Sequence, residues 1–291
     1  MIIVPRDEKE KALDTFYRLR DKLNDEYKDT KDVELMIQVL EKDDETLLDQ
    51  MSLQGCAYFF RFVDYKYYGE IFINLVNQIF SSDEDEVKKT YIKTNLIPSD
   101  LLNDEELLEK ILSQNDEVFN CFKYYKFDNT SLDVLTKILN RLENIDSDFF
   151  ISQCDSKKSF IAQNVEYSKR IVSTDKFVEK ARRIESLYLK KMFYNCKEII
   201  ESFSIVDRIK FVNSITDTNV QREIFEELDL KRYPDSLTPD LIEYLDVDTL
   251  KKGIDNGIYK FIGFLPPEEQ IKLLSDPNIP INEVSYRLSL D

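Results

Sequence analysis

The sequence predicts an all-α protein, built as an irregular array of helical pairs similar to an α-solenoid, or as a multi-helix bundle. Only 5 glycines and 8 prolines punctuate the 291 residues, whereas all-β and doubly wound α/β folds need many more turn residues. Hydrophobic residues make up 42% of the chain, with 19 Phe and 16 Tyr, which is too apolar for a disordered protein. Because apolar side chains also recur every three to four residues, helices are the structure that the sequence favours.

The first 55 residues predict three helices. Residues 7–27 carry an apolar stripe at helical spacing between charged residues, and residues 33–40 have the same pattern. A third helix is expected to begin near Glu45. These segments alternate apolar and charged faces, so each helix is expected to bury one face against its neighbours.

Residues 56–80 are the most aromatic part of the chain. Residues 70–80 have clear helical spacing, and we expect residues 58–68 to be helical as well, although the pattern there also fits a strand. Core packing is the interpretation that large aromatic side chains favour. The alternative is a binding surface, since exposed aromatic residues make good hot spots. Tyr65, Tyr67 and Tyr68 are the residues expected to reach that surface.

An acidic run follows this aromatic segment. Two serines and then four consecutive acids predict a loop that leads into a helix, because Ser and Asp cap helices and acids suit a helix N-terminus. A solvated loop is the favoured interpretation of such a run. The alternative is that the run imitates a nucleic-acid backbone and occupies a basic groove of another protein. The four acids are Asp83, Glu84, Asp85 and Glu86.

Proline marks several helix starts in the rest of the chain. Pro98, Pro239 and Pro267 each stand just before or within a predicted first turn, where the missing N–H costs nothing. Helices are also expected at residues 132–142 and 205–215. Pro239 and Pro267 lie 28 residues apart, a spacing that suits successive helical pairs, although no regular repeat emerges.

The longest helix is expected over residues 175–203, where apolar residues step by three and four. Basic residues recur every seven positions in the same segment, and on a continuous helix they would lie along one side. Such a stripe could bind an acidic partner or a phosphate backbone. The favoured alternative is pairing with acidic neighbouring helices. The stripe consists of Lys176, Arg183, Lys190 and Lys197, with Lys180 beside them.

The chain divides most naturally into an N-terminal helical region, residues 1–172, and a C-terminal helical region, residues 173–291, unless the two form one continuous domain. The first residues carry charge straight after Pro5, and no uncharged run approaches the length of a membrane span. We therefore expect no signal peptide and no membrane partner, and a cytoplasmic location, in the producing cell or in a host.

Composition narrows the function classes. The chain contains no histidine, the residue most used for proton transfer and for transition-metal binding. Its four cysteines are too far apart for a zinc site and are expected to be reduced and mostly buried. A net charge of −17 makes direct nucleic-acid binding unfavourable and favours a partner with a basic surface. We expect no metal site and no cofactor.

One short motif has a catalytic character. Asp246, Asp248 and Thr249 resemble part of the Asp-x-Asp-x-Thr signature of haloacid-dehalogenase-type phosphatases, in which the first Asp attacks phosphorus with the help of magnesium. The position of the family's Thr is occupied here by Leu250. The favoured interpretation is that Asp246 or Asp248 caps a helix.

These observations lead to three hypotheses. The first is a non-catalytic adaptor, regulator or inhibitor that binds another protein through a helical surface. The second is an acidic viral or phage inhibitor that blocks a nucleic-acid-binding host enzyme by charge mimicry. The third is a phosphoryl-transfer enzyme that uses carboxylates and magnesium.

Overall fold

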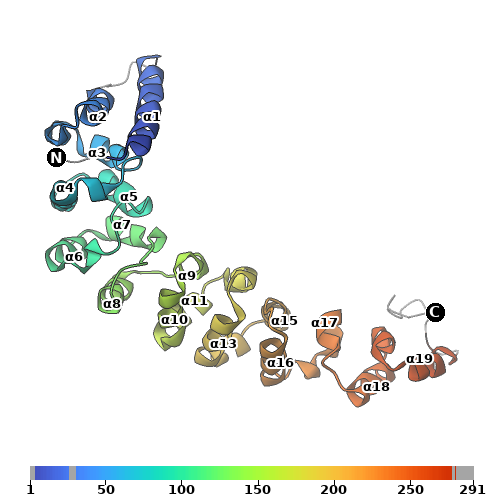
Figure 1. Ribbon diagram of the computed structural model, residues 1–291. Helices are drawn as coiled ribbons and strands as arrows, with labels where there is room; N and C mark the ends of the chain where they lie inside the picture. The colour runs from blue at the N-terminus through green and yellow to red at the C-terminus, as the bar shows by residue number, and fades with distance from the viewer. Residues whose placement is uncertain (1–3, 26–30, 277–278, 280–291) are drawn as a thin grey trace. The chain divides into compact units, whose positions relative to one another are not determined.

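The computed structural model describes residues 4–25, 31–276 and 279, and within these ranges every regular element is an α-helix or a 3₁₀-helix (Figure 1). The predicted all-α class is confirmed. Over the same ranges, no helix has both the length and the apolar character needed to cross a membrane.

The chain forms two compact units. The first comprises Met1–Ile145 with Ser152–Lys157, and the second comprises Asp146–Ile151 with Lys158–Asp291. The division expected at residue 172 falls inside the second unit. The boundary between the units runs through two helices, α9 (Ser147–Ser152) and α10 (Asp155–Gln163).

The first unit begins with the longest helix of the described residues and continues in short helices. The expected helix over residues 7–27 is present as α1, and its last two expected residues lie outside the described part. The elements are α1 (Arg6–Asp25), α2 (Lys31–Lys42), η1 (Glu45–Gln50), α3 (Leu53–Phe59), η2 (Tyr65–Tyr67), α4 (Gly69–Ser81), α5 (Asp85–Lys93), η3 (Leu101–Asn103), α6 (Glu105–Leu112), α7 (Asp116–Phe119), η4 (Asn120–Tyr124) and α8 (Leu132–Arg141).

The second unit repeats this alternation of short helices and connectors. The expected helix starts at Pro239, Pro267 and residue 205 are confirmed. The elements are α11 (Val165–Val172), α12 (Phe177–Lys180), η5 (Ala181–Arg183), α13 (Ser186–Asn195), α14 (Lys197–Glu201), α15 (Ile205–Asn213), α16 (Thr218–Glu227), η6 (Leu230–Arg232), η7 (Pro234–Ser236), α17 (Pro239–Ile242), α18 (Val247–Asp255), η8 (Tyr259–Phe264) and α19 (Pro267–Leu274).

Within each unit the helices pack in two rows, as in an array of helical pairs. In the first unit α4, α6 and α8 contact one another in sequence on one side, and α5 packs against α7 and η4 on the other (Figure 1). In the second unit α11, α13 and α16 form one row, and α12 packs against α15 in the other. Each pair therefore buries its apolar faces mainly against the pairs next to it.

The expected single helix over residues 175–203 is wrong. The backbone is extended at Ile184 and Glu185, with ψ near 131° and 140°. Helix α13 ends at Asn195, and φ is −130° at its C-cap, Cys196. The apolar stripe is nevertheless buried on both sides of these breaks, as at Phe177 and Met192. The spacing of three and four correctly indicated which residues face the core, but successive short helices produce the same pattern as one long helix.

The expected helix over residues 58–68 is also wrong beyond Phe59, where α3 ends. The chain turns, and Asp64 caps the short η2 by accepting a hydrogen bond from the backbone N–H of Lys66 at 3.0 Å. Asp64 therefore caps a new short helix, and α3 does not continue through the turn. Residues 70–80, in contrast, are helical as expected, in α4.

Side chains from one pair satisfy the backbone of the next pair's connectors. The connector after η4 lies between the connector that contains Asn95 and Ile97 and the one that contains Gln153. The Tyr125 hydroxyl donates to the carbonyl of Ile97 at 2.6 Å, and Asn95 Oδ1 accepts from the N–H of Lys126 at 2.7 Å. From the other direction, the buried Gln153 amide accepts from Phe127 N–H at 3.1 Å and donates to the carbonyl of Tyr125 at 2.9 Å. The backbone N–H and C=O groups of these connectors have no strand partner among the described residues. Side chains from the adjacent pairs supply their hydrogen bonds instead.

The second unit uses the same device. Ser186 Oγ accepts hydrogen bonds from the backbone N–H groups of Thr216 and Asp217, at 3.1 and 3.0 Å. Asn195 donates its amide to the carbonyl of Ala162 at 3.0 Å, 33 residues away. The bonded residues lie 30 to 33 positions apart in the sequence, about the length of one helical pair. Each bond therefore ties one pair to its neighbour.

Arg141, the last residue of α8, makes several such contacts. Its guanidinium donates to the carbonyls of Leu112 and Gln114, where α6 ends, and lies 4.2 Å from the ring centroid of Phe119. It thereby satisfies carbonyls that the end of α6 leaves without helical partners. One side chain from α8 thus holds α6 and α7 together.

We predict that Arg141→Met lowers the free energy of unfolding by about 2–4 kcal/mol, because the carbonyls at the end of α6 lose charge-assisted hydrogen bonds while remaining partly buried. The matched control is Arg18→Met, since Arg18 forms only an exposed ion pair with Asp14 and should change stability by no more than about 0.5 kcal/mol. Urea denaturation followed by circular dichroism measures both. Equal effects of the two substitutions would contradict this role of Arg141.

Candidate functional site

The structure distributes the predicted basic stripe over both rows of the second unit. Lys180 and Arg183 both reach Asp148 of α9, the latter at 3.5 Å. Lys190 binds Glu223 of α16 at 2.7 Å, and this hydrogen bond lowers the pKa of the Glu223 carboxyl. The favoured interpretation, pairing with acidic neighbouring helices, therefore describes these three cations.

The remaining two residues of the stripe differ from each other. Lys197 binds Glu227 at 2.6 Å, and this contact raises the pKa of the lysine. Lys176 is exposed at the start of α12, and no described residue pairs with it. The stripe is not one continuous basic face, because the helix that would have aligned it is interrupted twice.

The three tyrosines predicted as a surface do not lie together on it. Tyr65 is 37% exposed, with its ring 5.1 Å from that of Phe72, and Tyr67 is half-buried and donates its hydroxyl to Glu8 at 3.1 Å. The expectation that Tyr68 reaches the surface is wrong. Its ring packs against those of Phe59 and Phe60, and its burial raises the pKa of its hydroxyl.

The acidic run is half neutralised by the helix that it begins. Asp83 and Glu84 lie in the connector and are exposed, as expected of a loop that leads into α5. Asp85 pairs with Lys88 at 3.2 Å, and Glu86 pairs with Lys89 at 3.0 Å. The bonds of Asp85 with Asn115 and Lys88 also lower the pKa of its carboxyl.

The motif at residues 246–249 is a helix cap. Asp246 stands at the N-cap of α18, where its Oδ1 accepts from the backbone N–H of Thr249 at 2.8 Å and its Oδ2 accepts from the Thr249 hydroxyl at 2.9 Å. These two bonds lower the pKa of the Asp246 carboxyl. The cap interpretation is thus confirmed for Asp246.

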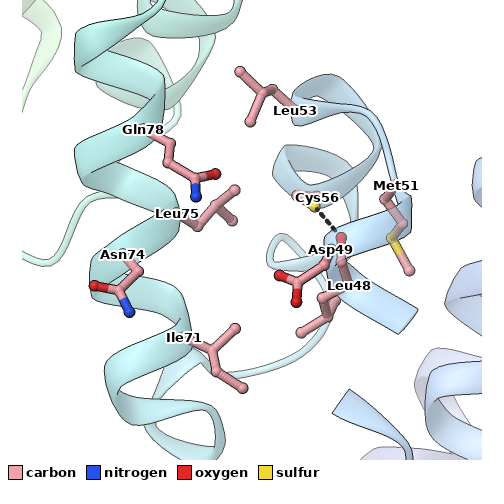
Figure 2. Close-up of a pocket in the computed structure, with 9 residues that line it drawn as sticks. All are labelled: Leu48, Asp49, Met51, Leu53, Cys56, Ile71, Asn74, Leu75 and Gln78. Carbon is pink, nitrogen blue, oxygen red and sulfur yellow. Dashed lines mark hydrogen bonds between the residues drawn. The ribbon is translucent and has the colours of Figure 1, made fainter. Parts of the chain in front are cut away.

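One concave feature of the first unit is a pocket of about 410 Å³ between η1 and α3 on one side and α4 on the other. Figure 2 shows Ile71 and Leu75 of α4 facing Leu48 and Cys56 across it, with Asn74 and Gln78 along the rim. We call it the α4 groove. Its lining residues are Leu48, Asp49, Met51, Leu53, Cys56, Ile71, Asn74, Leu75 and Gln78.

The floor of the α4 groove is apolar. Leu48, Met51, Cys56 and Leu75 are each at most 9% exposed. The Cys56 thiol donates to the carbonyl of Leu48 at 3.5 Å, as drawn in Figure 2. Burial, reinforced by the charges of Asp32 and Asp49, raises the pKa of this thiol to about 12. Cys56 is therefore a neutral, apolar lining group at physiological pH.

The rim of the groove is polar and exposed, with Asp49, Asn74 and Gln78 all open to solvent. Amide groups at such positions can donate to or accept from a bound main chain. Sequence reasoning missed this site, because Ile71 and Leu75 have the same helical spacing as core residues. A signal available in the sequence was the polar pair Asn74 and Gln78, four residues apart on the largely apolar α4.

Within the described residues, no three acidic or cysteine side chains are placed to share a metal ion. All four thiols are free, and three of them are buried, as the sequence predicted. Comparison with family models, with curated proteins and with solved structures gives no match to this chain.

We predict that one thiol of the native protein reacts quickly with a disulfide reagent such as DTNB at mildly alkaline pH. Burial raises the pKa of Cys56, Cys121 and Cys196, whereas Cys154 is only half-buried. The three buried thiols should react at least about 100-fold more slowly, because little thiolate is available. Cys154→Ser should remove the fast phase, and all four thiols should react in denaturant. A fast phase that survives Cys154→Ser would contradict the assignment.

We predict that Asp246→Asn preserves stability while Asp246→Ala lowers it, because Asn caps a helix about as well as Asp. The lowered pKa of Asp246 means that its stabilising effect is present above the ordinary carboxyl pKa and is lost as the pH falls through the lowered value. Asp246→Asn should abolish that acid-dependent loss. Chemical denaturation across acidic pH measures this, and magnesium-dependent phosphatase turnover lost in Asp246→Asn would instead support a catalytic Asp246.

Proposed function

We propose that this protein is a non-catalytic adaptor, regulator or inhibitor that binds another protein, and that the α4 groove holds a segment of that partner. The observation that carries the proposal is an open groove with a buried apolar floor and an exposed polar rim. Sites that bind ligands combine an apolar lining with a few polar groups that orient the bound molecule.

The chemistry of the lining supports a protein segment as the ligand. Leucine, isoleucine and methionine side chains gain most by covering other apolar side chains, and methionine adapts its shape to different partners. Asn74 and Gln78 offer amide groups one turn apart on α4, within reach of a chain laid along the helix. An apolar side chain of the partner would act as an anchor, with polar contacts around it.

The other predicted surfaces give weaker support. The basic residues Lys180, Arg183, Lys190 and Lys197 are engaged in ion pairs within the second unit. Exposed pairs of this kind contribute little to stability, yet they leave fewer charges for a partner. In the acidic run, Lys88 and Lys89 pair with two of the four carboxylates that charge mimicry would need. No observation therefore favours charge mimicry over groove binding. Buried free thiols support an action in a reducing compartment such as the cytoplasm.

We predict that Asn74→Trp abolishes capture of the partner, because an indole at the exposed rim would fill the groove without changing the core. The immobilised full chain is incubated with an extract of the producing cell, and the retained proteins are compared by mass spectrometry. Asn219→Trp is the matched control, since Asn219 is an exposed helical residue of the second unit. Retention of the same proteins by wild type and Asn74→Trp would contradict binding in the groove.

A further inference from the structure

We propose that the partner segment in the α4 groove is positively charged and amphipathic, with an apolar side chain seated on the groove's floor and lysine or arginine side chains over its rim. The inference rests on the proposed function and specifies the chemistry of the partner. It is carried by the distribution of charge around the groove.

The elements that form the groove carry only negative charge. Across η1, α3 and α4 there are three acidic residues, Glu45, Asp49 and Glu70, and no lysine or arginine. No described residue forms an ion pair with any of the three. This contrasts with the acidic run, where Lys88 and Lys89 neutralise two carboxylates.

Of the three carboxylates, only Asp49 lines the groove, and Glu45 and Glu70 lie on the elements that form it. Asp49 is part of the lining and is exposed, and its charge raises the pKa of Cys56 on the floor. Glu45 begins η1, and its charge contributes to the raised pKa of the nearby Tyr68. Glu70 is exposed in the first turn of α4, one residue before the lining residue Ile71.

An apolar floor beside the unpaired carboxylate of Asp49 selects its ligand by charge. A cationic segment gains attraction to the rim while its apolar side chain leaves water, whereas an acidic segment would be repelled. A second copy of this chain is disfavoured as the occupant, because each copy has a net charge of −17. The surplus of negative charge over the whole chain adds to the attraction of a basic partner at long range.

The test uses the full chain and three fluorescent synthetic peptides. The basic probe alternates leucines and lysines so that one face is apolar. Its acidic twin has every lysine replaced by glutamate, and its third form has every leucine replaced by alanine. Fluorescence anisotropy should detect binding of the basic probe, and this binding should weaken as salt is raised. The acidic form and the alanine form should each bind at least about tenfold more weakly than the basic probe.

Substitutions in the chain test whether the basic probe binds in the groove. Asp49→Lys should weaken the basic probe by at least about tenfold, while Glu84→Lys, which changes the net charge equally in the acidic run, should change it by less than about twofold. Asn74→Trp, or Gln78→Trp if that variant does not fold, should abolish binding. Circular dichroism melting curves that match wild type show that a variant is folded.

The outcomes separate this inference from the proposed function. If capture from the extract depends on the groove but the basic probe binds no better than its acidic twin, the partner is not cationic and the inference is overturned while the proposed function stands. Equal losses from Asp49→Lys and Glu84→Lys would overturn it too, because total charge and not the groove would then govern binding. A dimer in light scattering that Asn74→Trp dissociates would make a second copy the occupant and overturn it as well.

Discussion

The array depends on one constraint, that the peptide groups of its connectors must be hydrogen-bonded although no strand in the described residues pairs with them. Side chains from the adjacent helical pair meet this requirement, as Gln153 does for Tyr125 and Phe127 and as Ser186 does for Thr216. Such bonds fix the position of each pair relative to the next, so that apolar faces meet in a defined register. Burial of those faces then supplies most of the stability.

The same constraint explains how the polar residues are used. Many amide, hydroxyl and cationic side chains serve the joints between pairs, and Arg141 joins three helices by capping the end of α6. The α4 groove lies apart from these joints. Its floor is apolar, and Asp49 in its lining has no ion pair among the described residues, which is why a partner's side chains could complete both the burial and the charge balance there.

The lining of the candidate site has no distinctive pattern in the sequence. Ile71 and Leu75 have the spacing of core residues, and Asp49 is one of 57 acidic residues, so neither is distinctive before the chain folds. The basic residues at seven-residue intervals were the stronger pattern, yet Lys190 and Lys197 pair with α16. A spacing in the sequence defines a surface only if the helix that carries it is continuous.

The sequence by itself determined the all-α class, the burial of the apolar stripes, the proline-marked helix starts and the cap at Asp246, because each follows from local backbone preference or from hydrophobic periodicity. The tertiary structure alone decided where the segment over residues 175–203 breaks, which charges are paired and where a groove remains open. Those features depend on side chains about 30 residues apart, such as Ser186 and Thr216, and local spacing carries no information about such contacts.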